Sequence, residues 1–309
     1  MPLHFLSQSD LTPKTIHALF ERTTVIKGER LSDALLGRSL VMFFEKTSTR
    51  TRLSFEIGMT QLGGHAVYLD RDSSQISRGE SVADLARVVS RYADLIMARV
   101  YAHRTVAELA EHASIPVING LSDAEHPCQS LTDLFTMLEC KGRLEGLKIA
   151  YLGDGDNNVA HSLMLGAAQV GADLWIASPG ELQPDTWFVD AAAKLSERFG
   201  GTVTVTENID QAVEHADVIY TDVWVSMGQE SENERRLELL RPYQVNRKSV
   251  SGAKPDFVFM HCLPAHIGQE VTAELAYGPH SVIFDQAENR LHVQKALMVY
   301  LFESSRGGE

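Results

Sequence analysis

The feature that most constrains the fold is a regular alternation of short apolar segments with longer segments of helical pattern. Candidate strands in the first half of the chain are Leu40–Phe44, Ala66–Leu69, Leu95–Ala98 and Pro116–Asn119. Candidates in the second half are Lys148–Leu152, Asp173–Ala177, Val203–Thr206, Val218–Thr221, Phe257–Met260 and Val282–Phe284. Strands that alternate with helices predict an α/β fold with parallel sheets.

The length of 309 residues allows two domains, each with its own core. A polar exit from a predicted helix, Cys140-Lys141-Gly142-Arg143, marks the expected boundary. We expect two doubly wound parallel-sheet domains, 1–143 and 144–285, with the active site in the cleft between them. The segment 286–309 carries an apolar stripe from Val293 to Leu301, which predicts a C-terminal helix that packs back on the first domain.

Charge and composition limit the partners of this chain. It has 28 Lys and Arg against 41 Asp and Glu, a net charge of −13, which argues against a general surface for nucleic acid or anionic membranes. No apolar segment approaches the roughly 18 residues of a membrane span. Cys128, Cys140 and Cys262 form no CxxC pair, so reduced thiols are expected. The sequence predicts a cytoplasmic protein with no nucleic-acid or membrane partner.

An anion site is predicted where the first strand gives way to a helical pattern, at Ser48-Thr49-Arg50-Thr51-Arg52. A helix start offers unpaired N–H groups and the positive end of the helix dipole, and Ser and Thr add donors. An arginine guanidinium matches the geometry of phosphate oxygens. The alternative is a helix cap followed by surface arginines.

Two further segments place polar groups at element ends. Arg99 closes the third strand, where open α/β sheets place ligand groups. His126-Pro127-Cys128-Gln129 begins a helix, since proline is tolerated in a first turn. An imidazole and an amide there can bind a carbonyl oxygen and an amino group. The alternatives are a solvated strand end for Arg99 and helix caps for His126 and Gln129.

The segment from Gly153 to Asn158 follows a strand and opens a helix, which is the context of a dinucleotide-binding turn. Two departures argue against a nicotinamide or flavin enzyme. Asn158 occupies the third glycine position, and the next strand ends in Ser178-Pro179 without an acidic residue for a ribose. An asparagine at a helix start can instead bind a carboxylate or amide of a small ligand.

Chemistry-bearing side chains also follow two later strands. Asp222 and Ser226 would pair a carboxylate with a hydroxyl, which suits an ammonium ligand, although a turn is the alternative. Cys262, in His261-Cys262-Leu263-Pro264, places a thiol at a strand's carboxyl end, although single cysteines are usually inert and buried. No metal is expected, because His261 and Cys262 are adjacent and no close second pair is evident. The long polar stretch from Asp222 to Arg236 predicts a lid loop.

Taken in this order, these segments resemble the aspartate/ornithine carbamoyltransferase family over essentially the whole chain. Ser48–Arg52, Arg99 and His126-Pro127-Cys128-Gln129 resemble the family's carbamoyl phosphate site. The Ser-Met-Gly loop from Asp222 to Gly228 and the His261-Cys262-Leu263-Pro264 segment resemble the members that act on ornithine. The resemblance assigns carbamoyl phosphate to 1–143 and ornithine to 144–285, with no metal or organic cofactor.

The resemblance also implies a role for each residue. The carbamoyl phosphate ligands would be Ser48, Thr49, Arg50, Thr51, Gln75, Arg99, His126, Gln129, Cys262, Leu263 and Arg290, and the catalytic residues would be Arg99, His126, Asp222 and Cys262. L-Ornithine would be bound by Asn158, Asp222, Ser226 and Met227. Gln75 resembles a residue that reaches a neighbouring subunit, which implies a homotrimer with shared active sites. The family's Leu-Pro bond is cis, so a cis Leu263–Pro264 bond is expected.

Other functions stay open at this point. The family's aspartate-specific members carry a lysine on the loop after the second strand, and Asp70–Glu80 contains none. Putrescine lacks the α-substituents that Asp222 and Ser226 would bind, and an acylated ornithine lacks the charged α-amine. A non-catalytic homologue would be expected to lose an arginine, the histidine or the Cys262 segment, all of which are present. The lid is expected to be mobile when empty and to close on ornithine after carbamoyl phosphate binds.

Overall fold

The computed structural model describes residues 2–29, 31–225 and 233–306. It divides into two compact units: unit 1 comprises Met1–Thr132 and Glu288–Glu309, and unit 2 comprises Asp133–Ala287. The borders fall inside the helices α5 (Pro127–Lys141) and α11 (Ile283–Arg306). The domain limits expected after residues 143 and 285 stay a prediction, since these borders describe contacts and not independent folding.

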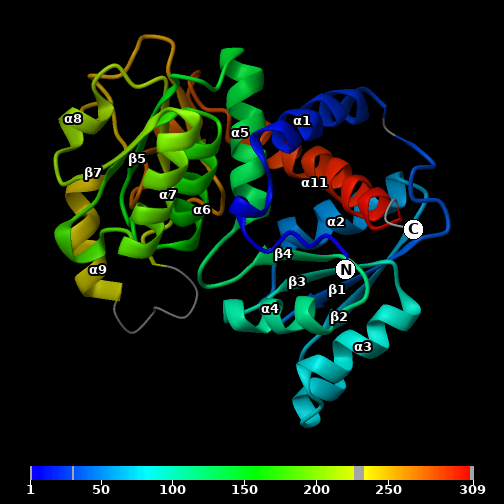
Figure 1. Cartoon of the computed structure of the whole chain (residues 1–309). Coiled ribbons are helices and arrows are strands. Elements are labelled where there is room, and N and C mark those ends of the chain that lie inside the picture. Colours follow the sequence, from blue (N-terminus) through cyan, green and yellow to red (C-terminus); the bar gives the residue numbers. More distant parts are fainter. Residues whose placement is uncertain (1, 30, 226–232, 307–309) are drawn as a thin grey trace. The chain divides into compact units, whose positions relative to one another are not determined.

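Unit 1 is built on a four-stranded, fully parallel sheet in the order β2-β1-β3-β4. Its strands are β1 (Ser39–Phe44), β2 (His65–Asp70), β3 (Leu95–Arg99) and β4 (Val117–Leu121), and its other helices are α1 (Pro13–Gly28), α2 (Thr49–Gln61), α3 (Val82–Tyr92) and α4 (His103–His112). Figure 1 shows α3 and α4 on one face of this sheet and α1, α2 and α11 on the other. The doubly wound arrangement predicted from the alternation is therefore confirmed in this unit.

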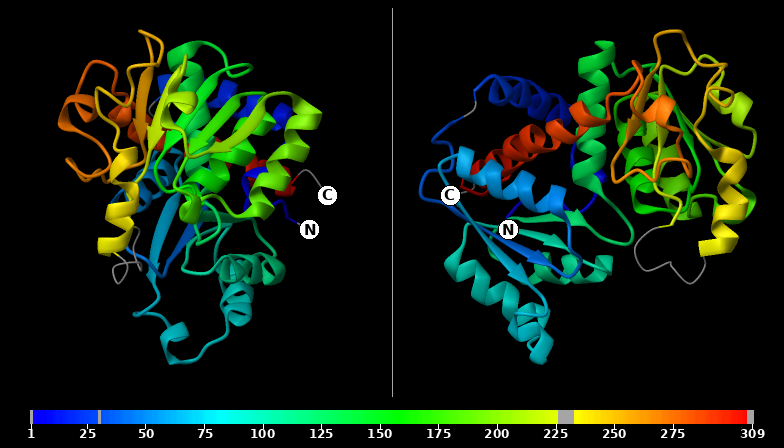
Figure 2. Two further views of the ribbon diagram at one scale, coloured as in Figure 1. Left: turned by 90° about the vertical axis from the view of Figure 1, so that its left-hand side faces the viewer. Right: turned by 180° about the vertical axis from the view of Figure 1, so that it is seen from behind.

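Unit 2 contains a five-stranded parallel sheet in the order β7-β6-β5-β8-β9. Its strands are β5 (Lys148–Leu152), β6 (Asp173–Ala177), β7 (Thr202–Thr206), β8 (Val218–Thr221) and β9 (Val258–His261), and its helices are α6 (Asn158–Gln169), α7 (Thr186–Phe199), α8 (Ile209–Val213), α9 (Asn233–Leu240) and α10 (Ala273–Ala276). Helices α6 and α7 cover one face, and the segment that includes α10 covers the other, as Figure 2 shows from behind. Both sheets thus carry helices or packed loops on each face.

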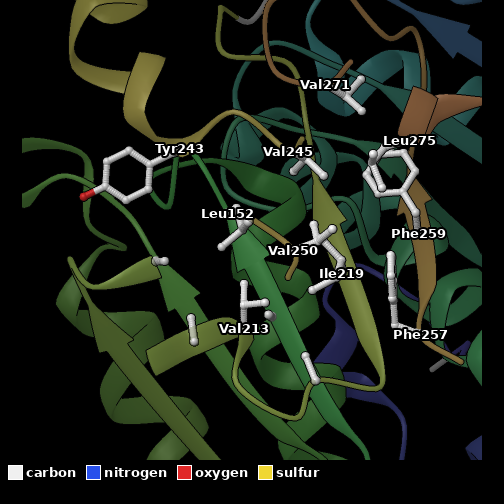
Figure 3. Packing of buried hydrophobic residues seen from close by; sticks show 14 of the residues in the cluster. Leu152, Val213, Ile219, Tyr243, Val245, Val250, Phe257, Phe259, Val271 and Leu275 are labelled. Atoms are coloured by element: carbon white, nitrogen blue, oxygen red, sulfur yellow. The ribbon is translucent and has the colours of Figure 1, made fainter. Parts of the chain in front are cut away.

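The second face of the unit 2 sheet holds a continuous apolar core (Figure 3). Leu152 and Ile219 project from neighbouring strands onto Val213 of α8 and onto Val245 and Val271 of the later segment. Each of these side chains is fully or almost fully buried. Because side chains alternate across a strand, the intervening Ile149, Tyr151 and Tyr220 point to the opposite face, where the Tyr220 hydroxyl donates to Asp133 of α5.

Two local predictions were wrong. Val282–Phe284 is not a strand: Ser281 makes one isolated bridge to Phe259, and α11 begins at Ile283. The Val282 carbonyl accepts a hydrogen bond from the Gln286 N–H, so helix formation ends the pairing after one residue. The predicted loop to Arg236 is also shorter, because α9 begins at Asn233. Leu237 and Leu240 of α9 pack with Trp224, which stabilises the helix there.

Within residues 2–29, 31–225 and 233–306, every helix is too short or too polar to span a bilayer.

Truncation of the unit 2 core should destabilise the protein. Ile219 is fully buried in the cluster of Figure 3, and Ile219→Ala should cost roughly 2–5 kcal/mol through lost burial and a residual cavity. Tyr277 is 64% exposed, so Tyr277→Ala should change stability by about 0.5 kcal/mol or less. Urea denaturation of both variants measures the difference. Equal midpoints would mean that this cluster does not hold unit 2 together.

Candidate active site

Each sheet has one switch point, where the strand order reverses. In unit 1 the chain passes from β1 to β2 on one side and later to β3 on the other side of β1. In unit 2 the same reversal separates β6 and β8 on the two sides of β5. Open α/β sheets bind ligands outside the carboxyl ends of the strands at such points. The topology therefore defines one candidate half-site in each unit.

The unit 1 half-site is here called the phosphate half-site, after the ligand predicted from the sequence. Its predicted residues are Ser48, Thr49, Arg50, Thr51, Arg99, His126, Gln129 and Arg290. Ser48 is the N-cap of α2, and its side chain accepts a hydrogen bond from the Thr51 N–H at 3.3 Å. The Ser48 hydroxyl therefore caps α2, as the alternative interpretation of this segment predicted. Thr49 and Arg50 in the first turn are exposed. The first turn of α2 and its positive dipole end therefore follow β1 at the switch point.

Arg99 lies at the other side of the same switch point, at the end of β3. Its backbone pairs with Phe44 of β1, so the two strands end together. Arg99 is 8% exposed, and its Nη1 lies 3.5 Å from the hydroxyl of Thr51, which is itself buried. The alternative of a solvated strand end is wrong for Arg99, because the side chain turns inward to α2.

The α5 segment contributes His126 and Gln129, both buried. The His126 carbonyl accepts from the Gln129 and Ser130 N–H groups and begins the helix. Burial lowers the pKa of the His126 imidazole well below its usual value, and the positive charges of Arg290 and Arg99 lower it further. A neutral imidazole presents one N–H donor, which is suited to a carbonyl oxygen.

Arg290, from α11, donates from Nη1 to the Gln129 Oε1 at 2.5 Å. The sequence separates these two residues by 161 positions, and only folding brings them together. Cys128, between His126 and Gln129, takes no part in this contact. It donates to the Asn119 carbonyl at 3.4 Å, and burial raises the pKa of its thiol to about 12.

Gln75 and Lys46 lie outside these contacts. Gln75 begins a short 3-10 helix, Gln75–Arg78, and its side chain is exposed.

Lys46 was missed by sequence analysis. Burial lowers the pKa of its ammonium group, and Arg99 lowers it further. The position of Lys46, two residues before Ser48, was the signal that could have identified it. With the buried Arg99 and Arg290, the half-buried Lys46 is a third cation at this end of the sheet.

The Gly153–Asn158 turn follows β5 at the switch point of unit 2. Gly153 has a φ of +128°. A Cβ on Gly155 would lie 2.9 Å from Pro184 and 3.0 Å from the Leu182 carbonyl, so close packing explains this glycine without a dinucleotide. The Asn157 side chain caps α6 by accepting from the Val159 and Ala160 N–H groups, and Asn158 is the first helical residue.

The unit 2 half-site is here called the amine half-site, after the ligand predicted from the sequence. Its predicted residues in the described part of the chain are Asn158, Asp222, Cys262 and Leu263. Asp222 follows β8 and is 6% exposed. The Cys262 thiol, which follows the neighbouring strand β9, donates to the Asp222 Oδ1 at 2.8 Å. Thr221 and His261 pair across these two strands, which sets their ends side by side. The predicted placement of a carboxylate and a thiol at one sheet edge is therefore observed.

The backbone beside Cys262 is held from both sides. Leu263 has a φ of +61°, and the Leu263–Pro264 bond is cis, as predicted. The His261 Nδ1 accepts from the Leu263 N–H at 2.9 Å, and its Nε2 lies 3.3 Å from the buried Glu270 carboxylate. The His261 N–H donates to Gln286 Oε1 at 2.9 Å. These contacts fix the peptide that follows the thiol.

Asp222, His261 and Cys262 each offer one possible metal ligand atom, and these atoms lie within 4.8 Å of one another. The sequence argument against a metal considered only His261 and Cys262, and it missed the third group because Asp222 is distant in the chain. All three residues already make hydrogen bonds here: His261 Nδ1 accepts from the Leu263 N–H, and the Cys262 thiol donates to the Asp222 Oδ1.

Arg236, from α9, pairs with Asp154 of the β5 turn, and both side chains are buried. Its Nε donates to the Trp224 carbonyl at 3.1 Å. One guanidinium thus joins α9 to the segments that follow β5 and β8. The predicted ornithine ligands Ser226 and Met227, and residues 226–232 of the predicted lid, lie outside the described residues.

The fold and these residues define the class of the protein. It is an α/β protein of the kind that binds ligands at the carboxyl ends of parallel strands, with a cationic half-site in one unit and a thiol–carboxylate pair in the other. The family model for the carbamoyl-P binding domain of aspartate/ornithine carbamoyltransferases matches residues 3–139, and the model for the Asp/Orn binding domain matches residues 145–301. The chain belongs to the aspartate/ornithine carbamoyltransferase family.

Individual relatives agree with the family models. The chain is 52% identical over 304 residues to the ornithine carbamoyltransferase of Bacillus subtilis (strain 168), covering 97% of this chain and 95% of that protein. It is 54% identical over 264 residues to a Pyrococcus furiosus protein named "Ornithine carbamoyltransferase, anabolic", covering 85% and 84% of the two chains. The solved structure of ornithine carbamoyltransferase from Pyrococcus furiosus matches with a TM-score of 0.93 at 49% identity, over 96% of this chain and 97% of that one.

Removal of the Arg236 charge should extend the pH dependence of stability to higher pH. Burial raises the pKa of Asp154 to about 6 from 3.8, although Arg236 lowers it. A raised carboxyl pKa costs stability as pH rises from the unfolded value to the folded value. In Arg236→Leu the pKa of Asp154 should rise further, so the loss continues above about pH 6.

Melting temperatures of wild type and Arg236→Leu between about pH 6 and pH 8 measure this effect. The deficit of the variant should widen with pH, and the double variant Asp154→Asn/Arg236→Leu should abolish the widening. A deficit independent of pH would contradict the assignment to Asp154.

Proposed function

We propose that this chain transfers the carbamoyl group of carbamoyl phosphate to the δ-amine of L-ornithine, which gives L-citrulline and phosphate. Relatives that carry the name ornithine carbamoyltransferase and match almost the whole chain support this activity. The single observation that carries the choice of an amine acceptor is the 2.8 Å contact between Cys262 and Asp222 at the switch point of unit 2. The phosphate half-site by itself would suit any carbamoyltransferase.

Carbamoyl phosphate binds to the phosphate half-site in this proposal. The first turn of α2 supplies backbone N–H groups, the Thr51 hydroxyl and the Arg50 guanidinium to the phosphate. Arg99 and neutral His126 donate to the carbamoyl oxygen, and Gln129 with Arg290 binds the carbamoyl amide. The positive charges near the carbonyl oxygen stabilise the negative charge that develops on it during attack.

L-Ornithine must react as a free amine. A primary amine with a reference pKa near 10.4 is neutral in only about one molecule in a few thousand at pH 7, which corresponds to roughly 4–5 kcal/mol. Desolvation lowers this pKa. The Cys262 thiol and the Asp222 carboxylate orient the δ-amine, while Asn158, Ser226 and Met227 bind the α-amino and α-carboxylate groups. The Leu263 carbonyl accepts from the carbamoyl NH₂.

The lone pair of the δ-nitrogen attacks the carbonyl carbon and forms the new carbon–nitrogen bond. The carbon–oxygen bond to phosphate breaks, and its electron pair leaves on phosphate. The nitrogen also loses one proton, which ends on the released phosphate as HPO₄²⁻, and ornithine becomes citrulline. The half-sites use charge, orientation and desolvation for this step, and the proposal requires no metal or organic cofactor.

A ureido-product assay tests the proposal. Carbamoyl phosphate is supplied with L-ornithine, putrescine, N-acetylornithine, L-lysine or L-aspartate. Selective turnover of ornithine is the expected result. Turnover of another amine would retain the donor and overturn the acceptor, and no turnover would favour a non-catalytic homologue. An absorbance titration with NADPH tests the oxidoreductase alternative, for which no binding is expected.

We also propose a homotrimer in which Gln75 reaches the phosphate bound by a neighbouring subunit. Exposed apolar side chains support an interface with a second copy: Leu53 and Ile57 of α2 are 48% and 43% exposed, and Val67 of the edge strand β2 is 44% exposed. The three cysteines form no disulfide and support a cytoplasmic location. Synthesis of citrulline for arginine biosynthesis is the proposed direction, which the anabolic name of the Pyrococcus furiosus relative supports.

Substitution of one residue in each half-site should separate the two substrates. Arg50→Ala should raise the KM for carbamoyl phosphate by roughly 10- to 100-fold, because a charged hydrogen bond to phosphate is lost. Cys262→Ala should raise the KM for ornithine and lower kcat, with little effect on carbamoyl phosphate. Steady-state kinetics measures both effects, with Arg91→Ala and Cys140→Ala as exposed controls. Unchanged kinetics in either variant would remove that residue from the site.

A shared site can be tested by subunit complementation. Light scattering should give a mass of about 103 kDa, three times the 34.2 kDa of one chain. Arg50→Ala and Gln75→Ala subunits should each have low activity. Hybrid trimers of the two should regain part of it, because one site then combines an intact Arg50 with an intact Gln75. No recovery in confirmed hybrids would argue against sharing.

A further inference from the structure

Arg290 depends on a buried side chain that no motif indicates. Gln294 lies one turn further along α11 and is fully buried. Its amide is oriented by its hydrogen bonds, with the oxygen toward the guanidinium and the nitrogen toward α2. The oxygen accepts from the Arg290 Nε at 3.0 Å and from Nη2 at 2.9 Å. A single amide therefore holds two donors of the guanidinium fork.

The other end of the amide reaches the phosphate-binding helix. The Gln294 nitrogen donates to the Ser54 Oγ at 2.6 Å and to the Arg290 carbonyl at 3.2 Å. Ser54 in turn donates to the Thr51 carbonyl at 3.1 Å. A continuous chain of hydrogen bonds thus runs from the Arg290 guanidinium to the first turn of α2.

Two partners of the Arg290 guanidinium are uncharged. Gln129 and Gln294 both hold Arg290 with neutral amide oxygens. An amide orients a guanidinium without cancelling its charge, whereas a carboxylate would pair with it. The charge of Arg290 already lowers the pKa of His126, so its field reaches the neighbouring ligand group.

We propose that Gln294 is a positioning residue of the phosphate half-site: it fixes the fork of Arg290 and couples it to α2 through Ser54 while leaving the positive charge available to carbamoyl phosphate. This inference rests on the proposed function, and it adds a residue that touches neither substrate. Gln294→Leu removes the contacts at similar volume. Gln294→Glu keeps an oxygen that can accept from Arg290, but it replaces the donor nitrogen with a second oxygen and introduces a negative charge.

Kinetics and phosphate binding form the first test. Gln294→Leu should raise the KM for carbamoyl phosphate about tenfold and leave the KM for ornithine unchanged. Gln294→Glu should also weaken carbamoyl phosphate binding, through its charge. Lys295→Met is the matched control. Lys295 is as buried as Gln294 on the same helix, and its ammonium group donates to the Gln61 side chain. The Lys295→Met variant should lower the melting temperature without changing either KM.

The second test measures geometry without turnover. The Arg290 Nε–H signal in a ¹⁵N spectrum, identified by its loss in Arg290→Lys, should exchange slowly in wild type and Gln294→Glu and fast in Gln294→Leu. In Gln294→Leu, an unchanged KM for carbamoyl phosphate or a slowly exchanging Nε–H signal would overturn the proposal. Carbamoyl phosphate binding by Gln294→Glu as tight as in wild type would also overturn it. So would a KM for carbamoyl phosphate that rises as much in Lys295→Met as in Gln294→Leu. If wild type forms no citrulline, the proposed function fails, and the Nε–H signal with calorimetric titration of inorganic phosphate still tests the positioning role.

Discussion

The constraint on which both half-sites depend is the parallel pairing of the strands. Parallel strands end at the same edge of a sheet, so residues that follow different strands meet there although they are far apart in sequence. The pairing of Phe44 with Arg99 brings α2 and β3 to one edge of unit 1. The pairing of Thr221 with His261 does the same for Asp222 and Cys262 in unit 2.

A second principle is that local charge, and not overall charge, determines ligand binding. The chain has a net charge of −13, yet Arg99 and Arg290 are buried with neutral hydrogen-bond partners that include Thr51 and Gln129. A buried cation is costly unless it is hydrogen-bonded or paired, so such groups favour an anionic ligand. Burial lowers the pKa of His126, and the same charges lower it further, which favours the neutral imidazole.

Sequence patterns predicted the fold well where the signal is local. Nine of the ten expected strands are present, because buried parallel strands have apolar segments of typical length. Val282–Phe284 is as apolar as the true strands, but strand pairing here is limited to one isolated bridge, between Phe259 and Ser281. The segment forms helix hydrogen bonds instead. The start of α9 was missed because its apolar face, with Leu237 and Leu240, is short and surrounded by charged residues.

The sequence by itself determined the α/β class, the strand ends that carry chemistry and the family to which the chain belongs, because these depend on local pattern and motif order. Tertiary structure alone decided the pairing of Arg290 with Gln129 and Gln294, of Asp222 with Cys262, and of Arg236 with Asp154. Each pair joins side chains from different elements or successive helical turns, and its geometry follows from packing and burial. No periodicity in a sequence specifies which buried polar group will satisfy another.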